Sequence, residues 1–436
     1  MIYNLLLYIY ELGVFVASFF SDKVKKMWRG ERQAIQYLKE HVDPDAEYAW
    51  FHAASLGEFE QGRPIIEEYR NVHPERKILQ TFFSPSGYEV RKNYDGADLI
   101  CYLPIDTFTN ARRFLRAVRP VEAFFIKYEF WYNYLHILRH RHVPVYSVSS
   151  IFRPGQIFFR WYGYQYRAVL RCFTHFFVQT EKSKELLSEL GYDNVTVTGD
   201  TRFDRVLQIA NQSKQIPVVE VFLNKGTTEK GGDNSAPVFV AGSSWLPDEE
   251  IFIPYFADHR DWKVIIAPHV IGESHISQIT KLLEGRRVMR YSQLRETDET
   301  ALREADVLII DCFGLLSSIY RYATVAYVGG GFGVGIHNLP EAAVWNVPVI
   351  FGPNHEKFQE ALELKACDGG ISINNAEDFR QVMTALTEQP EELKRRSDAA
   401  GQYVKTHSGA AGKILSAVVQ KSPSLVRHNS IAAPNR

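Results

Sequence analysis

The chain has 436 residues, a length that suggests two or three domains. Its 45 % hydrophobic and 23 % charged residues are ordinary globular composition, which excludes a disordered chain, a collagen and a coiled coil. The 50 basic and 51 acidic residues nearly cancel, so no overall positive field attracts nucleic acid. Its four cysteines lie far apart and form no CxxC motif or Cys/His cluster, so neither a disulfide framework nor a structural zinc site is indicated.

The chain begins with a run of 19 mostly apolar residues, from Ile2 to Phe20. As a helix this run would be roughly 28 Å long, close to the thickness of a bilayer's hydrocarbon core. A basic segment, residues 23–32, follows the run, and no small-residue cleavage site is visible. A secretory signal peptide is therefore not indicated, and the positive-inside rule predicts a cytoplasmic location for the rest of the chain.

Polar residues mark one side of this first helix. Asn4, Glu11 and Ser18 are spaced seven apart and so share one helix face. Such a stripe suggests a helix lying in the membrane interface, or a spanning helix whose polar seam meets a partner. The alternative is an amphipathic helix packed on the protein's own core. We expect membrane attachment through residues 1–32.

After residue 45, apolar strands alternate with amphipathic helices. The predicted strands span residues 47–54, 77–83, 99–103, 123–126, 143–149, 238–241, 263–267, 307–310, 324–328 and 347–351. The predicted helices span residues 58–71, 87–94, 107–118, 131–141, 273–283, 315–321, 339–345, 357–364, 376–386 and 391–405. This repetition predicts parallel sheets covered by helices on both faces, an α/β class of fold.

The Gly/Thr/Asn-rich segment 225–236 predicts a linker. It divides an N-terminal domain, residues 45–224, from a C-terminal domain, residues 237–421, and the polar tail 422–436 is expected to be loose. Two Rossmann-like, doubly wound domains facing one cleft form the GT-B architecture of glycosyltransferases. Ligands in such sheets bind at the carboxyl ends of the strands.

In the first half, charged residues follow two predicted strands and one turn. The sequence HAASLGE puts Glu58 at a strand-to-helix junction, where its carboxylate would project into the cleft or simply complement the helix dipole. Lys127 and Glu129 follow the strand 123–126, with a buried salt bridge as the alternative. Asp200 and Arg202 lie in a glycine turn near the end of this half, with an ordinary surface turn as the alternative.

In the second half, a glycine run, GGGFGVG, follows the strand 324–328. Glycine lets a backbone approach a ligand closely, and the N-terminus of the next helix attracts phosphate. No GxGxxG fingerprint and no P-loop motif is present. A tight turn is the alternative, although five glycines in seven residues exceed what a turn needs. Other strand ends in this half carry Ser243, Ser244, His269, Phe313 and Gly314, and their convergence indicates a ligand site.

Two further patterns concern metals and membranes. The one DxD motif, at residues 43–45, precedes the first strand and is interpreted as a turn, so the sequence predicts no metal site. The segment 151–167 interleaves Arg153, Arg160 and Arg167 with aromatic residues, a composition that suits anionic lipid headgroups. Stacking on single-stranded nucleic acid and an ordinary solvated helix are the alternatives.

The motifs together resemble the bacterial 3-deoxy-D-manno-octulosonic acid (Kdo) transferases of lipid A assembly. They appear in the family's order, from the N-terminal run to about residue 365: HAASLGE, LPID, RRFLRAVRP, KYEFW, TGDTRFD, AGSSW, VGGGFGVGIHNLPEAA and FGPNHEKF. The resemblance implies a GT-B, inverting enzyme that needs no metal or other cofactor. Such an enzyme moves Kdo from CMP-Kdo to a lipid A precursor on the cytoplasmic side of the inner membrane, with membrane lipids and no nucleic acid as partners.

The resemblance also assigns roles to residues. It implies that Glu58 is the general base and that Glu129 is a second acid of the acceptor half, with Lys127 as an acceptor contact. It implies that Arg202 holds the donor phosphate. The residues implied for the nucleotide side are Ser243, Ser244, Gly330, Gly331, His337, Asn338 and Glu341, of which Glu341 suits the ribose hydroxyls.

Two departures from the family's pattern stand out. His269 occupies a position where the family usually has Arg, and the family's TGN…K pattern is TGD…R at Asp200 and Arg202. The dipole of the helix that starts near Glu58 is expected to lower the pKa of that carboxyl. Two other functions stay open: a different nucleotide-sugar enzyme of this fold, such as an epimerase or another membrane-linked glycosyltransferase, and a membrane-bound binding protein without catalysis.

Overall fold

The structure is a computed structural model that describes residues 2–223, 236–295, 298–333 and 335–421. All but the last residue of the predicted linker, and the whole predicted tail 422–436, lie outside the described residues. The chain forms two compact units. Unit 1 comprises Met1–Arg205 and Ser408–Arg436, and unit 2 comprises Val206–His407.

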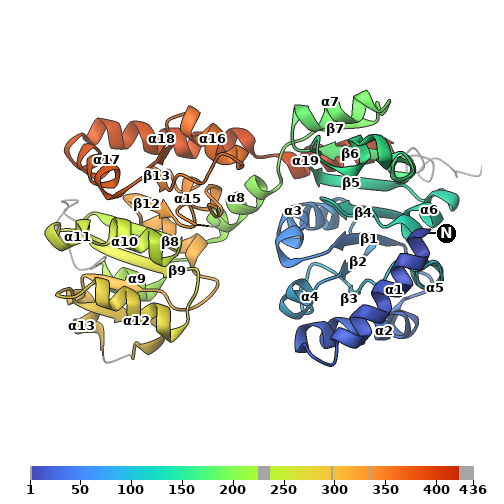
Figure 1. The fold of residues 1–436 in the computed structure, drawn as a ribbon, viewed down its shortest axis with the longest axis horizontal. Helices are drawn as coiled ribbons and strands as arrows, with labels where there is room; N and C mark the ends of the chain where they lie inside the picture. The colour runs from blue at the N-terminus through green and yellow to red at the C-terminus, as the bar shows by residue number, and fades with distance from the viewer. Residues whose placement is uncertain (1, 224–235, 296–297, 334, 422–436) are drawn as a thin grey trace, which may run out of the picture. The chain divides into compact units, whose positions relative to one another are not determined.

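Unit 1 is a parallel sheet of seven strands between layers of helices (Figure 1). Its elements are α1 (Ile2–Ala17), α2 (Asp22–His41), β1 (Tyr48–Ala53), α3 (Leu56–Val72), β2 (Lys77–Phe82), α4 (Pro85–Arg91), β3 (Leu99–Tyr102), α5 (Phe108–Val118), β4 (Glu122–Ile126), α6 (Tyr132–His140), β5 (Val145–Ser150), the 3₁₀ turns η1 (Ile157–Phe159), η2 (Trp161–Gly163) and η3 (Tyr166–Cys172), β6 (His175–Val178), α7 (Glu181–Glu189), β7 (Val195–Val197) and α19 (Ala410–Lys421). The strand order is β3-β2-β1-β4-β5-β6-β7.

The sheet of unit 1 is buried on both faces, which explains why its strands are nearly continuous apolar runs. Residues of α2, α5, α6 and α7 pack on one face in a single hydrophobic cluster. Residues of α3 and α19 pack on the other face in a second cluster. The predicted parallel sheet with helices on both sides is therefore confirmed for this unit.

The last helix, α19, belongs to unit 1 rather than to the second half of the chain. Ile414, Leu415 and Val418 are buried in the same cluster as Phe59 and Ile65 of α3. The carboxylate of Asp204 accepts hydrogen bonds from the backbone N–H groups of Gly409, Ala410 and Ala411, at 2.7, 3.1 and 3.3 Å, and so fixes the start of α19. The structure thus differs from the predicted domains 45–224 and 237–421. Residues 206–223 belong to unit 2, and the final helix returns to unit 1. The helix α19 itself was not predicted, and periodicity in a sequence does not show which sheet a terminal helix covers.

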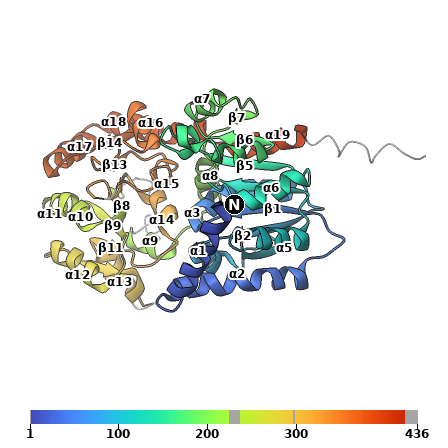
Figure 2. The ribbon, with the colours of Figure 1, turned by 45° about the vertical axis from the view of Figure 1, so that its right-hand side comes forward.

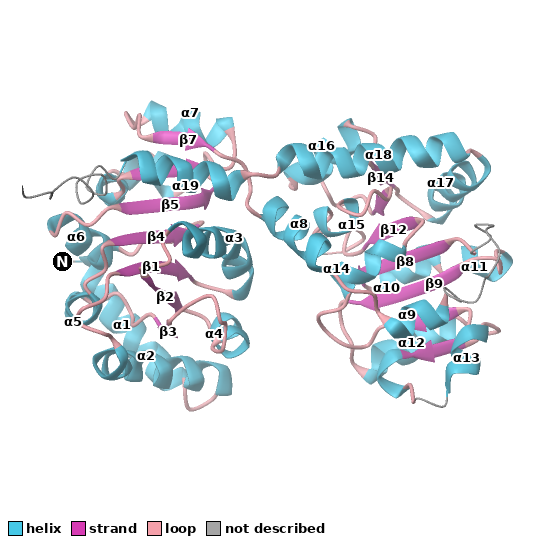
Figure 3. Ribbon diagram, turned by 180° about the vertical axis from the view of Figure 1, so that it is seen from behind, coloured by secondary structure: helices cyan, strands magenta, loops and turns pink. Residues whose placement is uncertain are grey.

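Unit 2 is a second parallel sheet of seven strands (Figure 3). Its elements are α8 (Arg202–Gln212, whose first turn belongs to unit 1), α9 (Pro217–Phe222), β8 (Val238–Ser244), α10 (Leu246–Phe252), α11 (Tyr255–Asp258), β9 (Lys263–Pro268), α12 (Glu273–Leu282), β10 (Val288–Arg290), η4 (Tyr291–Gln293), α13 (Glu299–Glu304), β11 (Val307–Ile309), α14 (Leu316–Ile319), η6 (Tyr320–Tyr322), β12 (Val325–Val328), α15 (Pro340–Ala343), β13 (Val349–Phe351), α16 (Gln359–Ala366), β14 (Gly370–Ser372), α17 (Ala376–Glu388) and α18 (Pro390–His407). The strand order is β10-β11-β9-β8-β12-β13-β14, and α10, α12 and α17 bury apolar side chains on one face.

In each sheet, one pair of neighbouring strands divides the strands that the chain adds on one side from those that it adds on the other. In unit 1 this topological switch point lies between β1 and β4, and in unit 2 it lies between β8 and β12. Parallel α/β sheets bind ligands in the crevice at the carboxyl ends of these two strands. The topology therefore points to the loops after β1 and β4 in unit 1, and to those after β8 and β12 in unit 2.

Candidate functional site

The switch point of unit 1 brings two of the predicted carboxylates together. Glu58 lies in the first turn of α3, directly after β1, and Glu129 lies in the loop after β4. Ser55 caps α3, and Glu58 Oε2 accepts hydrogen bonds from Ser55 N at 3.0 Å and Ser55 Oγ at 3.3 Å. This capping box, a reciprocal pairing of the N-cap and the third helical residue, holds the Glu58 side chain in place.

Glu129 is fixed by a network that begins inside the sheet. Its Oε2 accepts a hydrogen bond from Trp131 Nε1 at 2.5 Å and lies 3.2 Å from His52 Nε2. His52 is fully buried at the end of β1, and its Nδ1 lies 2.9 Å from Thr81 Oγ1 on the neighbouring strand β2. A chain of contacts from β2 through β1 thus positions the carboxylate of Glu129 beside that of Glu58.

The electrostatics of Glu58 differ from the prediction. Burial raises the pKa of Glu58, and the negative charge of Glu129 raises it further, while His52, the Ser55 backbone and Lys127 partly oppose the shift. The prediction that the helix dipole lowers this pKa is therefore wrong. A dipole effect of a few tenths of a kcal/mol at a helix start is smaller than the cost of withdrawing a carboxylate from water.

Further charged side chains lie near Glu58 and Glu129. Lys127 sits in a left-handed backbone conformation (φ 65°), and burial lowers the pKa of its ammonium, as does the nearby Arg202. Arg202 is itself held by Asp200, with Nε 2.7 Å from Asp200 Oδ2. Gln61 of α3 donates to Asp200 Oδ1 at 3.4 Å. Glu58, Lys127, Asp200 and Arg202 therefore belong to one electrostatic neighbourhood.

In unit 2, the ends of β8 and β12 are tied together by a residue that the sequence analysis did not single out. The carboxylate of Asp248 accepts hydrogen bonds from Trp245 N, Gly330 N and Tyr327 OH, at 2.9, 2.8 and 2.9 Å. Ser244 is fully buried and donates its hydroxyl to Glu249 Oε1 at 2.8 Å. Ser244 is thus part of the scaffold of this edge, contrary to its predicted donor contact, whereas Ser243 is only partly buried and has a left-handed backbone (φ 52°).

The glycine run is more tightly packed than a phosphate-binding loop requires. A Cβ on Gly329 would come within 2.4 Å of Ser243 O, and one on Gly331 within 2.5 Å of Gly352 N. The amides of Gly329, Gly330, Gly333 and Gly335 all donate to protein oxygens. Close packing of backbone against backbone therefore explains these glycines, and the predicted role of the run's amides as a phosphate cradle is not supported at those four positions.

Three rings form a stack beside the run. His269, after β9, lies 4.7 Å from the Trp245 ring and 4.4 Å from the His337 ring, nearly parallel to both. Trp245 Nε1 donates to His337 Nε2 at 3.1 Å, and burial together with the charge of His269 lowers the pKa of His337. The predicted donor residues His269 and His337 are thus brought into direct contact.

The other predicted donor residues lie on neighbouring loops of unit 2. Glu341 accepts hydrogen bonds from Asn338 Nδ2 and Ser317 Oγ, at 2.8 and 2.9 Å. Phe313 is 82 % exposed and precedes Gly314, whose φ of 91° favours glycine. The exposed ring and the polar pair suit contacts with a flat base and with vicinal hydroxyls.

Metal ligands are scarce in the part of the chain that the structure describes. No group of three or more His, Cys, Asp or Glu side chains there could hold a metal ion. The DxD motif forms a turn before β1, in which Asp43 Oδ2 accepts a hydrogen bond from Lys77 Nζ at 2.8 Å and Asp43 Oδ1 accepts one from Asp45 N at 3.1 Å. These two acids therefore serve the turn, at the amino end of the sheet.

Unit 1 also exposes an apolar helix. The predicted polar stripe of α1 faces the protein, where Asn133 Nδ2 donates to Asn4 Oδ1 at 2.8 Å and Ser18 is buried. The opposite side is exposed to solvent, with its large apolar residues at Leu5, Leu6, Tyr8, Ile9, Tyr10, Leu12, Phe15 and Val16, followed by Phe19 and Phe20. Figure 2 shows α1 beside α2, which carries the basic residues 23–32. Among the described helices, none is long and apolar enough to span a bilayer.

The basic and aromatic segment 151–167 forms 3₁₀ turns rather than the helix considered as an alternative. Trp161 is 87 % exposed, Tyr162 and Tyr164 are also exposed, and so are Arg153 and Arg160. Arg167 is different, because its guanidinium donates to the carbonyl oxygens of Phe158 at 2.8 Å and Arg160 at 3.4 Å. Arg167 thus stabilises the turns, and its predicted role as a surface contact is replaced by a structural one.

Three positions that complete these sites were not predicted from the sequence: His52, Trp245 and Asp248. His52 and Trp245 lie at or just beyond the ends of predicted strands, and those positions were the available signal. Trp131 belongs to the KYEFW motif that follows the strand 123–126, but its contact with Glu129 was not predicted. Asp248 stands three residues after Trp245 at a helix start, a capping position that gives no sign of its long-range bonds.

Unit 1 is similar in sequence to a known protein family. Residues 28–205 match a family model described as "3-Deoxy-D-manno-octulosonic-acid transferase (kdotransferase)". A 3-deoxy-D-manno-octulosonic acid transferase of Aquifex aeolicus is 26 % identical over 352 residues, which cover 79 % of this chain and 87 % of that protein. The likeness to the Kdo transferase family model thus lies in unit 1, and the likeness to the Aquifex protein extends over most of the chain. The matched residues include Glu58, Lys127, Glu129 and Arg202.

Solved structures bear on the fold of the chain. The UDP-GlcNAc 2-epimerase of Neisseria meningitidis superposes with a TM-score of 0.60 at 17 % identity, covering 86 % of this chain and 100 % of that one. MurG of Acinetobacter baumannii superposes with a TM-score of 0.54 at 11 % identity, covering 86 % and 99 %. At these identities the likeness concerns the GT-B-like fold of two Rossmann-like domains, which confirms the predicted fold class.

Proposed function

We propose that this chain is an inverting, metal-independent glycosyltransferase of lipopolysaccharide biosynthesis that moves Kdo from CMP-Kdo to a lipid A precursor. One observation carries the proposal: two partly buried carboxylates, Glu58 and Glu129, meet at the switch point of the unit that matches the Kdo transferase model. A glycosyl acceptor hydroxyl needs a base at such a position, and a raised pKa makes a carboxylate a stronger base.

The chemistry follows from the contacts of these residues. Glu58 accepts the proton of the acceptor hydroxyl as its oxygen attacks the anomeric carbon of Kdo. His52 and Trp131 keep Glu129 beside Glu58, and its negative charge strengthens the base. Arg202 supplies positive charge to the phosphate that leaves with CMP. Lys127, in the same neighbourhood, pairs with an anionic group of the acceptor.

Unit 2 is proposed to bind the donor nucleotide. The exposed Phe313 ring offers a stacking surface for the base, and Glu341, oriented by Asn338, suits the ribose hydroxyls. The His269 and His337 rings, backed by Trp245, supply hydrogen-bonding groups near the glycine run. His269 replaces the Arg that the family usually carries, so this chain would rely less on a permanent positive charge at that position.

The site of action is proposed to be the cytoplasmic side of the inner membrane. The exposed apolar side of α1 suits a helix lying in the interface, since its polar side is occupied by contacts with the protein. The exposed basic residues of α2 and the Trp161 and Arg160 side chains would meet anionic headgroups. The enzyme would then reach a lipid acceptor while that lipid stays in the membrane.

A transfer assay with radiolabelled CMP-Kdo and a lipid A precursor, run beside a panel of UDP-sugars, tests the proposal. We expect labelled lipid with CMP-Kdo alone. Conversion of a UDP-sugar without an acceptor would favour an epimerase, and transfer from a UDP-sugar would favour another glycosyltransferase. Binding of donor or acceptor without turnover would favour a non-catalytic binding protein. Any of these three results overturns the proposal.

A further inference from the structure

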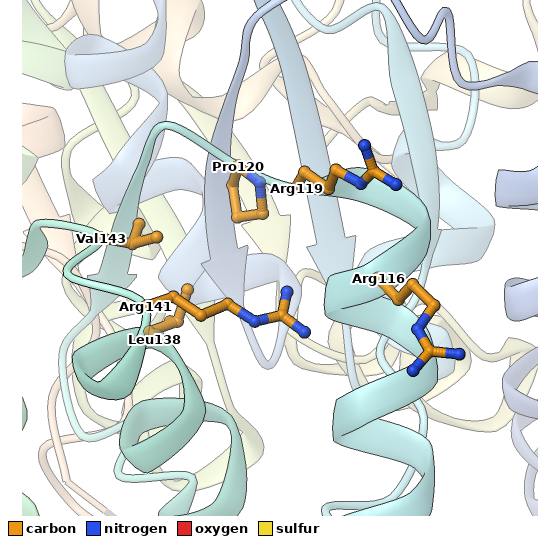
Figure 4. A pocket seen from close by; sticks show the side chains of 6 residues that line it. All are labelled: Arg116, Arg119, Pro120, Leu138, Arg141 and Val143. Carbon is orange, nitrogen blue, oxygen red and sulfur yellow. The ribbon is translucent and has the colours of Figure 1, made fainter.

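A surface hollow of about 300 Å³ opens on unit 1, at the edge of the sheet opposite to Glu58. It lies where α5 and α6 end and where β4 and β5 begin, because Arg119 precedes β4 and Val143 precedes β5. Its lining consists of Arg116, Arg119, Pro120, Leu138, Arg141 and Val143 (Figure 4). Three arginines thus surround a hollow at the lower end of the range for small-molecule sites, which is about 300–1,000 Å³.

The positive charge of this hollow is not neutralised by the protein. Within the described ranges, no carboxylate lies in salt-bridge distance of Arg116, Arg119 or Arg141. Desolvation lowers the pKa of Arg141, and the like charges of Arg116, Arg119 and Arg112 lower it further. The end of α5 carries only about half a negative charge, which three arginines exceed. The group therefore favours a bound anion.

Two of the arginines are held in place by the end of α5. Arg141 Nη1 donates to Leu115 O at 2.7 Å, which anchors the guanidinium that reaches from the end of α6 toward α5 (Figure 4). Arg119 is the C-cap of α5 and has a left-handed backbone, with φ 49° and ψ 58°. Glycine is favoured in this conformation, because the Cβ of any other residue introduces steric strain. The chain thus keeps an arginine where glycine would fold more easily.

We propose that this hollow binds a phosphate ester through Arg116, Arg119 and Arg141. The planar guanidinium donates two parallel N–H groups to phosphate oxygens, and several such groups can share one phosphate. The apolar side chains of Leu138 and Val143, with Pro120, contact the carbon skeleton that bears the phosphate. The ester is either a soluble metabolite or the headgroup of an anionic phospholipid. This proposal is independent of the proposed Kdo transfer.

Binding to the full-length protein by isothermal titration calorimetry tests the proposal, with glycerol 3-phosphate as the soluble probe. Vesicles of phosphatidylglycerol in phosphatidylcholine are the lipid probe. The decisive variant is Arg119→Gly, and Arg113→Gln is the control, because Arg113 is on the same helix, has the same charge and does not line the hollow. Binding of a probe at any other site on the protein contributes equally to the titrations of both variants and so does not affect their comparison.

We expect Arg119→Gly to weaken binding at least tenfold, with an unchanged or higher melting temperature, while Arg113→Gln binds like the wild type. A difference with glycerol 3-phosphate assigns the site to a soluble ester, and a difference on vesicles alone assigns it to a headgroup. Wild-type affinity of Arg119→Gly for both probes would overturn the proposal. So would equal weakening of both variants, which would mean general attraction by the basic surface.

Discussion

Replacing Glu58 by glutamine tests the proposed base directly. The amide cannot take the proton of the acceptor hydroxyl, so kcat should fall by about 10²–10⁴-fold, the usual contribution of a general base. That loss corresponds to about 3–5 kcal/mol of transition-state stabilisation at 1.36 kcal/mol per factor of ten. Radiolabelled Kdo transfer to a lipid A precursor measures it.

The fold should tolerate this change. Glutamine can fill the same position of a capping box, with its carbonyl oxygen accepting the hydrogen bond that Ser55 N now donates to Glu58. The raised pKa of Glu58 means that the ionised carboxyl lowers the free energy of unfolding, and so the stability, at neutral pH. Its favourable contribution is present below the unfolded-state pKa and is lost as the pH rises through the folded-state pKa. Above that pH, Glu58→Gln should melt at the same temperature as the wild type or higher.

The pH profile gives an independent check. The acid limb of kcat/KM for the wild type should lie above the ordinary glutamate pKa of about 4.3, since burial raises the pKa of Glu58. This limb should be missing from the residual activity of Glu58→Gln. Glu67→Gln is the matched control, because Glu67 lies on α3 in a surface pair with Arg63. Near-normal turnover of folded Glu58→Gln, or an equal loss in Glu67→Gln, would remove Glu58 from the role of base.

Three further outcomes are expected. Transfer should survive EDTA, and a loss that magnesium restores would contradict the metal-independent proposal. Deletion of residues 2–20 should weaken vesicle binding only partly, leaving salt-sensitive binding through residues 23–32 and Trp161. Vesicle sedimentation across a salt series measures this binding. If the truncated protein binds vesicles at no salt concentration, α1 alone attaches the protein to the membrane. Gly331→Ala should lower both the melting temperature and donor affinity, because its Cβ would lie 2.5 Å from Gly352 N, whereas Gly333→Ala, with its nearest atom 3.9 Å away, should behave like the wild type in both assays.

The sequence predicted the parts of the fold that local pattern determines. Mostly apolar runs identified β1, β2 and β4, since strands buried on both faces carry few polar residues. The strands β6, β7, β10 and β14, of three or four residues each, were missed, because so few residues show no period. The three-residue strands β11 and β13 were predicted, because each lies within a longer apolar run.

Strand ends were an equally good guide to the candidate site in unit 1. They located Glu58, Glu129 and Lys127, because residues that follow parallel strands share one edge. The direction of the pKa shift of Glu58 could not be obtained in this way. The direction of the shift depends on the burial of Glu58 and on its distance to Glu129, which is 71 positions away in the chain. Neither quantity can be obtained from the residues next to Glu58 in the sequence.

The return of α19 to unit 1 has a consequence for biosynthesis. Unit 2 is one uninterrupted stretch of about 200 residues, so it can fold as soon as it leaves the ribosome. The face of α3 that Ile414 and Val418 cover stays exposed until α19 has been synthesised. About 340 residues separate α3 from α19, so at about 5–20 residues per second this apolar surface stays uncovered for about 17–70 s. The nascent first half is therefore the part of this protein that most needs a chaperone.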